Sequence, residues 1–328
     1  MTAARRLWFS CLPAACLFAF SVWTGGCGTE PQKNATQAAG RSSSSAAPAR
    51  ADAGPPPETT GGFDGGKAYA HVERLVAIGP RSPGSEGMRR AQEYIRGQLQ
   101  SFGCPVEEDD FHASTPIGSV PMKNIVAKIP GASSRVVLLT THYDTKRMEN
   151  FVGANDGGSS TGVMLEMARL LCGRKNALTV WIAFFDGEEA FVEWGPTDGT
   201  FGSRQMAAKL AVSGELVHVK AMLLADLVGD RSLKIKRESN STHWLTDLVW
   251  GTAARLGYRN IFVSEETPIE DDHIPFLRRG VPAVDIIDLE EPYWHTSGDT
   301  LDKISPRSLA IVGHVFLESL AALEKKLS

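Results

Sequence analysis

The sequence predicts an α/β protein, with a single three-layer α/β/α domain whose mixed, largely parallel central sheet is flanked by helices. Two observations support this fold class. Segments with strand character alternate along the chain with segments of helical apolar spacing. The apolar run 178–185 is typical of a strand buried on both faces of a parallel sheet. The chain has 328 residues, of which 42% are hydrophobic, so its length allows one sizeable core.

The expected elements follow from apolar periodicity and from start and stop signals. In segment 86–102, Ala91, Ile95 and Leu99 fall on one helical face, and Ser305-Pro306 is a typical helix start. Helices are expected over 67–78, 86–102, 161–172, 205–212, 244–256 and 305–327. Strands are expected over 120–129, 135–141, 178–185, 221–227 and 283–287.

The N-terminus has the pattern of an export signal. Arg5 and Arg6 precede an apolar stretch from Leu7 to Trp23, which is short for a membrane-spanning helix of roughly 20 residues. The small residues Gly25-Gly26 before Cys27 resemble a bacterial lipoprotein processing site, although Thr24 stands where such sites usually carry Leu. We therefore expect residues 1–26 to be a lipoprotein-type signal peptide and Cys27 to be acylated. Simple secretion and a retained membrane anchor are the alternatives.

The segment after the signal, residues 27–65, is rich in Ser, Ala, Pro and Gly and predicts a disordered tether. A catalytic domain over 66–328 should follow, exported and lipid-anchored on the cell envelope, and monomeric. The net charge of −4 and the absence of a Lys/Arg run argue against nucleic acid as a partner. Beyond the leader and Cys27, the cysteines are Cys104 and Cys172, which form either one disulfide or two buried thiols.

Potential metal ligands gather at the predicted strand ends, where α/β sheets bind their ligands. Each has an ordinary explanation, such as a helix cap for Asp156 or a solvated pair for Glu188 and Glu189. Their coincidence beside buried strands nevertheless favours a metal, because buried charges are costly unless paired. Carboxylate and imidazole without thiolate favour a catalytic zinc. The residues concerned are His142, Asp144, Asp156, Glu188, Glu189, Asp226 and His295.

This ligand set resembles the zinc aminopeptidase superfamily over roughly residues 67–327. Two longer stretches are similar to the glutaminyl cyclases, which belong to that superfamily. The first is 184–191 together with Trp194 and Gly202-Ser203-Arg204, and the second is 271–282. These stretches are more specific than the ligand set alone.

The resemblance implies a role for each matching residue. Asp156, Glu189 and His295 would bind one zinc ion, and Glu188 would be the proton shuttle. Asp271 and Asp226 would form a hydrogen-bonded acidic network with Glu188 that raises its pKa. Trp194 and Trp294 would line the substrate pocket. The substrate would be a peptide or protein with N-terminal Gln, which cyclises to pyroglutamate with release of ammonia.

Two other functions compete with this interpretation. A two-zinc aminopeptidase would use His142 and Asp226 with a bridging Asp156 for a second metal, and Glu188 to activate water. A non-catalytic surface lipoprotein would keep the fold as a binding module. The chain also departs from the animal cyclases, because Asp285 stands in place of a His, and Thr141 and Thr161 stand in place of a disulfide pair.

Overall fold

The computed structural model describes residue 52 and residues 54–327. The predicted signal peptide and Cys27 lie outside the described residues, as does most of the predicted tether. Within the described part of the chain, no helix is both long and apolar enough to cross a membrane.

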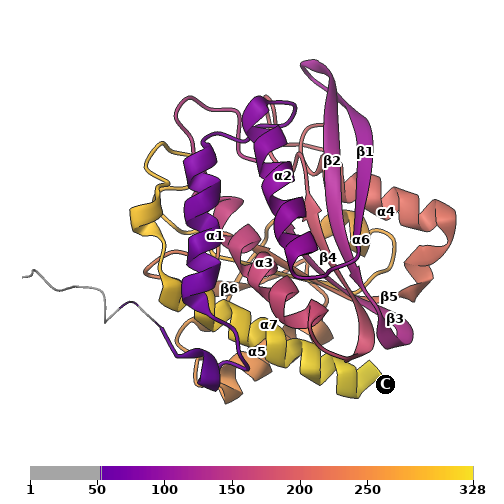
Figure 1. Cartoon of the computed structure of the whole chain (residues 1–328), viewed down its shortest axis with the longest axis vertical. Coiled ribbons are helices and arrows are strands. Elements are labelled where there is room, and N and C mark those ends of the chain that lie inside the picture. Colours follow the sequence, from indigo (N-terminus) through magenta and orange to yellow (C-terminus); the bar gives the residue numbers. More distant parts are fainter. Residues whose placement is uncertain (1–51, 53, 328) are drawn as a thin grey trace, which may run out of the picture. The chain divides into compact units, whose positions relative to one another are not determined.

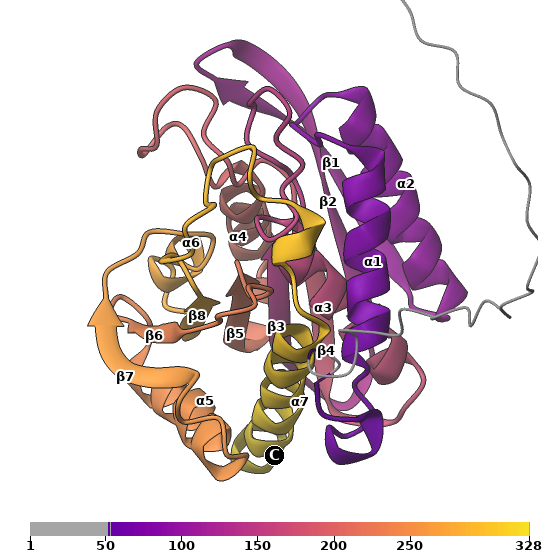
Figure 2. The same ribbon diagram turned by 90° about the vertical axis from the view of Figure 1, so that its left-hand side faces the viewer.

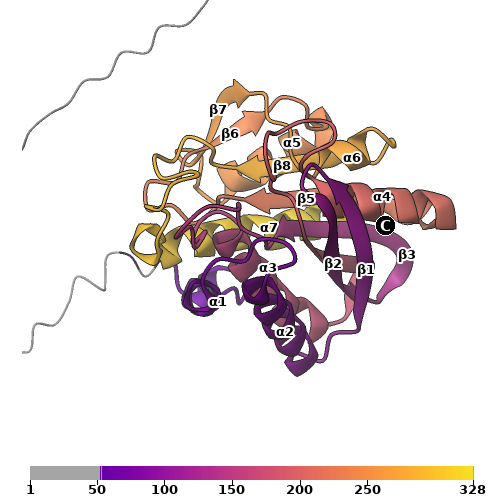
Figure 3. The same ribbon diagram turned by 90° about the horizontal axis from the view of Figure 1, so that it is seen from above.

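A six-stranded mixed sheet forms the centre of the fold, in the order β1-β2-β4-β3-β5-β8. The neighbouring strands β4, β3, β5 and β8 run parallel, whereas β2 pairs antiparallel with β4 and with the edge strand β1. Figure 3 shows β1 and β2 toward one end of this order and β8 toward the other. The strands are β1 (Val106–Thr115), β2 (Gly118–Ile129), β3 (Gly131–His142), β4 (Asn176–Phe185), β5 (Val219–Asp226) and β8 (Ala283–Ile287).

Helices cover both faces of the sheet, as the fold class predicts (Figure 1). The larger hydrophobic cluster joins one face to α1 (Gly65–Ile78), α2 (Glu86–Ser101), α3 (Gly158–Cys172), α5 (His243–Arg255) and α7 (Pro306–Leu327). The smaller cluster joins the other face to α4 (Phe201–Ser213) and α6 (Ile274–Leu277). Short 3-10 turns occupy Pro57–Thr59, Glu215–His218 and Leu301–Lys303.

Three strands were not expected from the sequence. The edge strand β1 carries four consecutive acidic residues from Glu107 to Asp110, so its sequence lacks the apolar alternation of a half-buried strand. Strands β6 (Ile235–Glu238) and β7 (Phe262–Thr267) form a separate two-stranded parallel sheet beside α5 (Figure 2).

The domain begins before residue 66, which corrects the expected end of the tether. Phe63 is fully buried, and its ring lies so close to Gly313 of α7 that a Cβ there would meet it at 2.3 Å. The main-chain oxygen of Asp52 accepts a hydrogen bond of 3.0 Å from Arg307. Burial of one large aromatic side chain in an otherwise polar segment is enough to attach the segment to the core.

Cys104 and Cys172 form a disulfide, with Cα atoms 5.3 Å apart. The sequence left this pairing open. The bond ties the segment after α2 to the last residue of α3, the helix that begins just after Asp156. It therefore fixes the far end of a helix whose first turn adjoins the predicted metal ligands.

Candidate active site

The predicted ligands meet where the parallel strands of the sheet end. His142 is the last residue of β3, Asp226 is the last residue of β5, and Glu188 and Glu189 follow β4. A pocket of about 320 Å³ opens there. Its walls include Asp156, Glu188, Glu189, Asp226, Asp271 and His295, together with Trp194, Trp294 and Lys146.

Two groups of potential metal ligands share Asp156. We call Asp156, Glu189 and His295 the outer site, and His142, Asp156 and Asp226 the inner site. In each, one ligand atom per residue lies within 4.8 Å of the others. The sequence-predicted ligands therefore come together as two adjoining sets.

The outer site faces the pocket. His295 Nε2 lies 3.1 Å from Glu189 Oε1 and 3.4 Å from Asp156 Oδ2, and the His295 side chain is 24% exposed. Asp156 Oδ2 is buried and has no hydrogen-bond partner among the described residues. A buried carboxylate oxygen without a donor, next to a second carboxylate and an imidazole, fits a zinc site with an open position.

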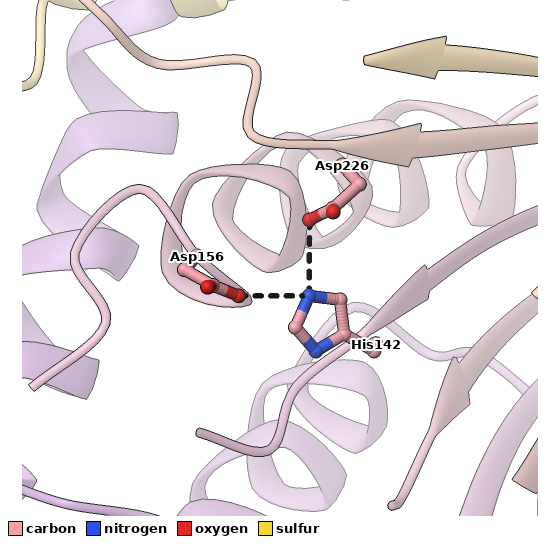
Figure 4. Close-up of side chains that lie close together, drawn as sticks. All are labelled: His142, Asp156 and Asp226. Atoms are coloured by element: carbon pink, nitrogen blue, oxygen red, sulfur yellow. Dashed lines mark hydrogen bonds and ion pairs between the residues drawn. The ribbon is translucent and has the colours of Figure 1, made fainter. Parts of the chain in front are cut away.

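The inner site lies deeper. His142 Nε2 is 3.0 Å from Asp226 Oδ1 and 3.3 Å from Asp156 Oδ1 (Figure 4). His142 Nδ1 lies 3.4 Å from Asp144 Oδ1, so carboxylates face both ring nitrogens. Burial would lower the pKa of His142, but Asp226 and the other two carboxylates raise it well above its usual value.

Asp144 holds the turn that carries the two glutamates. Its carboxylate oxygens accept hydrogen bonds from the backbone N–H groups of Glu188 at 3.0 Å and Glu189 at 3.3 Å. Gly187 precedes them with φ of 71°, a left-handed conformation that favours glycine. Asp144 therefore sets the direction of both glutamates without being a ligand of the outer site.

A second carboxylate, that of Asp299, holds the loop that carries Asp156. Its oxygens accept from the backbone N–H groups of Asn155 at 2.7 Å and Asp156 at 3.0 Å. No local signal in the sequence singles out Asp299, because its carboxylate contacts residues more than 140 positions away.

Arg81 links the two ligand-bearing loops. Its side chain is fully buried and donates to the carbonyls of Tyr143 at 3.1 Å, Val152 at 2.7 Å and Gly153 at 3.0 Å. Burial lowers its pKa to about 10, which leaves the guanidinium charged at neutral pH. Tyr143 lies next to Asp144, and Gly153 begins the turn to Asp156. Arg81 is therefore a clamp between the loops that was not apparent from the sequence.

Glu188 has the raised pKa that is expected of a proton shuttle. Burial, and not the charge of neighbouring carboxylates, is the main cause that raises this pKa well above the usual range. The nearby charge of Asp271 raises it further, while His142 opposes the shift. Asp271 and Asp226 line the same pocket as Glu188. The expected hydrogen-bonded network of these three carboxyl groups stays a prediction, because two carboxyl groups bond directly only through a shared proton. Asp226 Oδ1 also accepts a hydrogen bond from Leu227 N–H at 2.8 Å.

Both tryptophans reach the pocket, with Trp194 41% and Trp294 42% exposed. The Trp294 ring stacks on His295 with centroids 4.2 Å apart. Lys146, which the sequence did not single out, lies across the pocket with Nζ 3.3 Å from Glu189 Oε2. The pocket thus combines a group of potential metal ligands with aromatic walls.

The comparisons with known proteins agree with this geometry. The model of peptidase family M28 matches residues 124–320. The glutaminyl-peptide cyclotransferase of Boiga irregularis is 33% identical over 281 residues, which cover 72% of this chain and 76% of the relative. The chain belongs to the glutaminyl-peptide cyclotransferases of peptidase family M28.

Solved structures of glutaminyl cyclases match the fold as well. That of an Acidobacteriales bacterium has a TM-score of 0.77 at 40% identity, covering 80% of this chain and 96% of that one. That of Porphyromonas gingivalis has a TM-score of 0.74 at 33% identity, covering 79% and 98%. A leucine aminopeptidase precursor from Bacteroides thetaiotaomicron also matches, with a TM-score of 0.72 at 29% identity over 79% and 97%.

Proposed function

We propose that this protein converts the N-terminal Gln of peptides or proteins to pyroglutamate, with release of ammonia. The observation that carries the proposal is the position of Glu188. Glu188 is buried in the wall of the pocket that Trp194 and Trp294 also line, and it is next in sequence to the outer-site residue Glu189. The names of the relatives and of the two bacterial cyclase structures support the same reaction.

The reaction forms a bond between the substrate's own α-amine nitrogen and its γ-carboxamide carbon, and breaks the bond from that carbon to the amide nitrogen. Zinc at the outer site would polarise the γ-carbonyl as a Lewis acid. Glu188 takes a proton from the attacking amine and gives it to the departing ammonia. Trp194 and Trp294 hold the Gln side chain and exclude water, which would otherwise compete as the nucleophile.

A single zinc ion, held in the outer site, is the expected cofactor. The outer site opens to the pocket, whereas His142 of the inner site is 1% exposed. The raised pKa of His142 favours an imidazolium between Asp156 and Asp226. That internal cation would balance the two carboxylates in place of a second metal ion.

An aminopeptidase remains the second candidate, and the inner site favours it. With His142 neutral, the inner site offers three ligands for a second metal beside the first. A matching solved structure is that of a leucine aminopeptidase precursor. In this alternative Glu188 would activate a water molecule instead of the substrate's amine.

Mass spectrometry of two peptides distinguishes the reactions. A Gln-initiated peptide should lose the mass of ammonia, and a Leu-initiated peptide of the same remaining sequence should stay intact. Release of the first residue from the Leu peptide would establish the aminopeptidase instead. If neither peptide changes with the zinc-loaded protein, the binding-module alternative applies.

The Glu188→Gln variant tests the shuttle. It should lower kcat by about 100-fold to 10,000-fold, because a positioned acid/base group contributes that much. Its zinc content, measured by atomic absorption, should equal that of the unchanged protein. Loss of zinc would show that Glu188 is a ligand.

Metal titration tests the number of ions. The chelator-treated protein should recover full activity with one equivalent of zinc, and a second equivalent should add nothing. A need for two equivalents would favour the aminopeptidase.

We also propose that the protein is exported and lipid-anchored through Cys27, and acts as a monomer. The leader sequence is the basis for the anchor. The Cys104–Cys172 disulfide supports an oxidising compartment. Labelling of growing cells with a fatty-acid probe should mark the unchanged protein and not a Cys27→Ser variant; equal labelling of both would exclude acylation of Cys27.

A further inference from the structure

A second, smaller hollow of about 90 Å³ adjoins the catalytic pocket. Trp194, Glu270 and Asp271 line both cavities, so the two meet along these side chains. Because the α-amine of a bound Gln must reach Glu188, the rest of the peptide has to leave the catalytic pocket along its rim. The hollow beyond Trp194 lies on one such exit.

Two arginines line this hollow from different elements. Arg204 belongs to the first turn of α4, and Arg278 directly follows α6. The two helices are in contact and can be followed in Figure 2. Both arginines belong to the stretches that most specifically resemble glutaminyl cyclases, and neither has a part in the metal site or in proton transfer.

The Arg204 guanidinium is held in place by contacts that are not ion pairs. It lies 4.8 Å from the centre of the Phe201 ring and donates a hydrogen bond to the carbonyl of Pro196. It forms no ion pair with any of the described residues. Arg278 has one distant, solvent-exposed pair, 3.9 Å from Glu270. Such exposed pairs contribute little energy, so this one leaves the Arg278 guanidinium available.

The two positive charges also act on each other. Burial is the main cause that lowers the pKa of Arg204; the charges of Asp272 and Asp198 raise it, and the charge of Arg278 lowers it by a smaller amount. An anion in the hollow would be attracted by both guanidiniums, although Glu270 and Asp271 also line it. Planar guanidinium groups bind carboxylates well, since they can donate two parallel hydrogen bonds.

We propose that this hollow is a substrate subsite for a carboxylate that lies downstream of the N-terminal Gln. The inference rests on the proposed function, because it places the Gln residue in the catalytic pocket. The carboxylate is either an acidic side chain or the C-terminus of a short peptide. The subsite would offset the repulsion that an acidic peptide meets at the carboxylate-rich catalytic pocket.

Three peptides separate these sources: Gln-Ala-Ala amide as the neutral reference, Gln-Glu-Ala amide, and Gln-Ala-Ala with a free C-terminus. At low salt, at least one of the two anionic peptides should have a KM about 1.5-fold to fivefold below the reference, the range expected of a partly exposed charge pair. The kcat values should agree. Equal or higher KM values for both anionic peptides would overturn the proposal.

Variants assign the effect to the hollow. Arg278→Gln and Arg204→Gln should each raise the KM of the favoured anionic peptide toward that of the reference and leave the reference unchanged. Arg279→Gln is the matched control. It removes the same charge one residue further along the chain, and the Arg279 side chain does not line the hollow. An equal loss in this control would indicate a general charge effect and contradict the subsite. Arg278 is exposed, so its variant should fold even if the Arg204 variant does not.

A binding measurement tests the subsite independently of the cyclisation reaction. The same peptides can be titrated calorimetrically into zinc-loaded Glu188→Gln protein and its Arg278→Gln derivative. A preference for the anionic peptide that disappears with Arg278 would support the subsite even if no peptide were cyclised. Equal affinity for all three peptides would exclude it even if cyclisation were efficient.

Discussion

The outer and inner sites use the same kinds of ligand and share Asp156, yet they differ in what surrounds them. The outer site opens to the pocket through His295, which is partly exposed and stacked on Trp294. The inner site is enclosed, and His142 already contacts carboxylates through both ring nitrogens. The difference suggests that ligand identity alone does not define a catalytic metal site. Access and charge balance decide which set can present a metal to a substrate.

Removal of one histidine from each site should give the largest contrast. His295→Ala should abolish activity and weaken zinc binding by more than about 100-fold, because loss of a direct ligand exceeds the ~10–100-fold effect of outer-shell changes. His142→Ala should weaken zinc binding within that smaller range. Competition with a chromogenic chelator measures both affinities. Equal losses would show that the two sites are energetically equivalent.

The Arg81 clamp should matter to both sites, since it contacts the loops of His142 and Asp156. Arg81→Met should lower the free energy of unfolding by roughly 3–5 kcal/mol, because several buried carbonyls lose their donors. Urea denaturation of the metal-free protein measures this, and Arg81→Lys should recover part of the loss. A change below about 1 kcal/mol in the methionine variant would mean that water replaces the guanidinium without cost.

The smallest expected effect concerns pH and the loop that leads to His295. Burial, and next the charge of Asp299, raise the pKa of Glu291 to about 7, and Glu291 Oε1 has no hydrogen-bond partner within the described part of the chain. The folded protein therefore holds this proton more tightly than the unfolded chain does. The group's contribution to stability falls as pH rises from the ordinary glutamate pKa to about 7. Glu291→Gln should thus stabilise the protein by about 1 kcal/mol at pH 8 and by almost nothing at pH 4.

Thermal unfolding of both proteins across that range provides the measurement. Stabilisation by Glu291→Gln that is larger at pH 4 than at pH 8 would contradict the assigned sign. The inner site lies on other loops, so the affinity difference between His142→Ala and His295→Ala should persist in the Glu291→Gln background.

The sequence predicted the core strands and the ligand set because both leave local signals. The apolar run of β4 ends directly at the acidic turn with Glu188 and Glu189, and the resemblance to known cyclases added Asp271 and the tryptophans. Arg81, Lys146 and Asp299 left no such signal, since their partners are distant in the chain. The sequence did not predict strand β1, because its acidic residues lack the apolar alternation of a half-buried strand. It did not predict the burial of Phe63, because a single apolar residue gives no periodicity.

The acidic edge strand affects how the protein associates with other molecules. A sheet edge offers unpaired backbone groups to which a strand from another molecule can add. In β1 the side chains of Glu107 and Asp110 are exposed, one on each face of this edge strand. A second copy aligned with this strand would bring like charges together, so the same acidic residues that hid this strand from sequence prediction also disfavour edge-to-edge association at high local concentration.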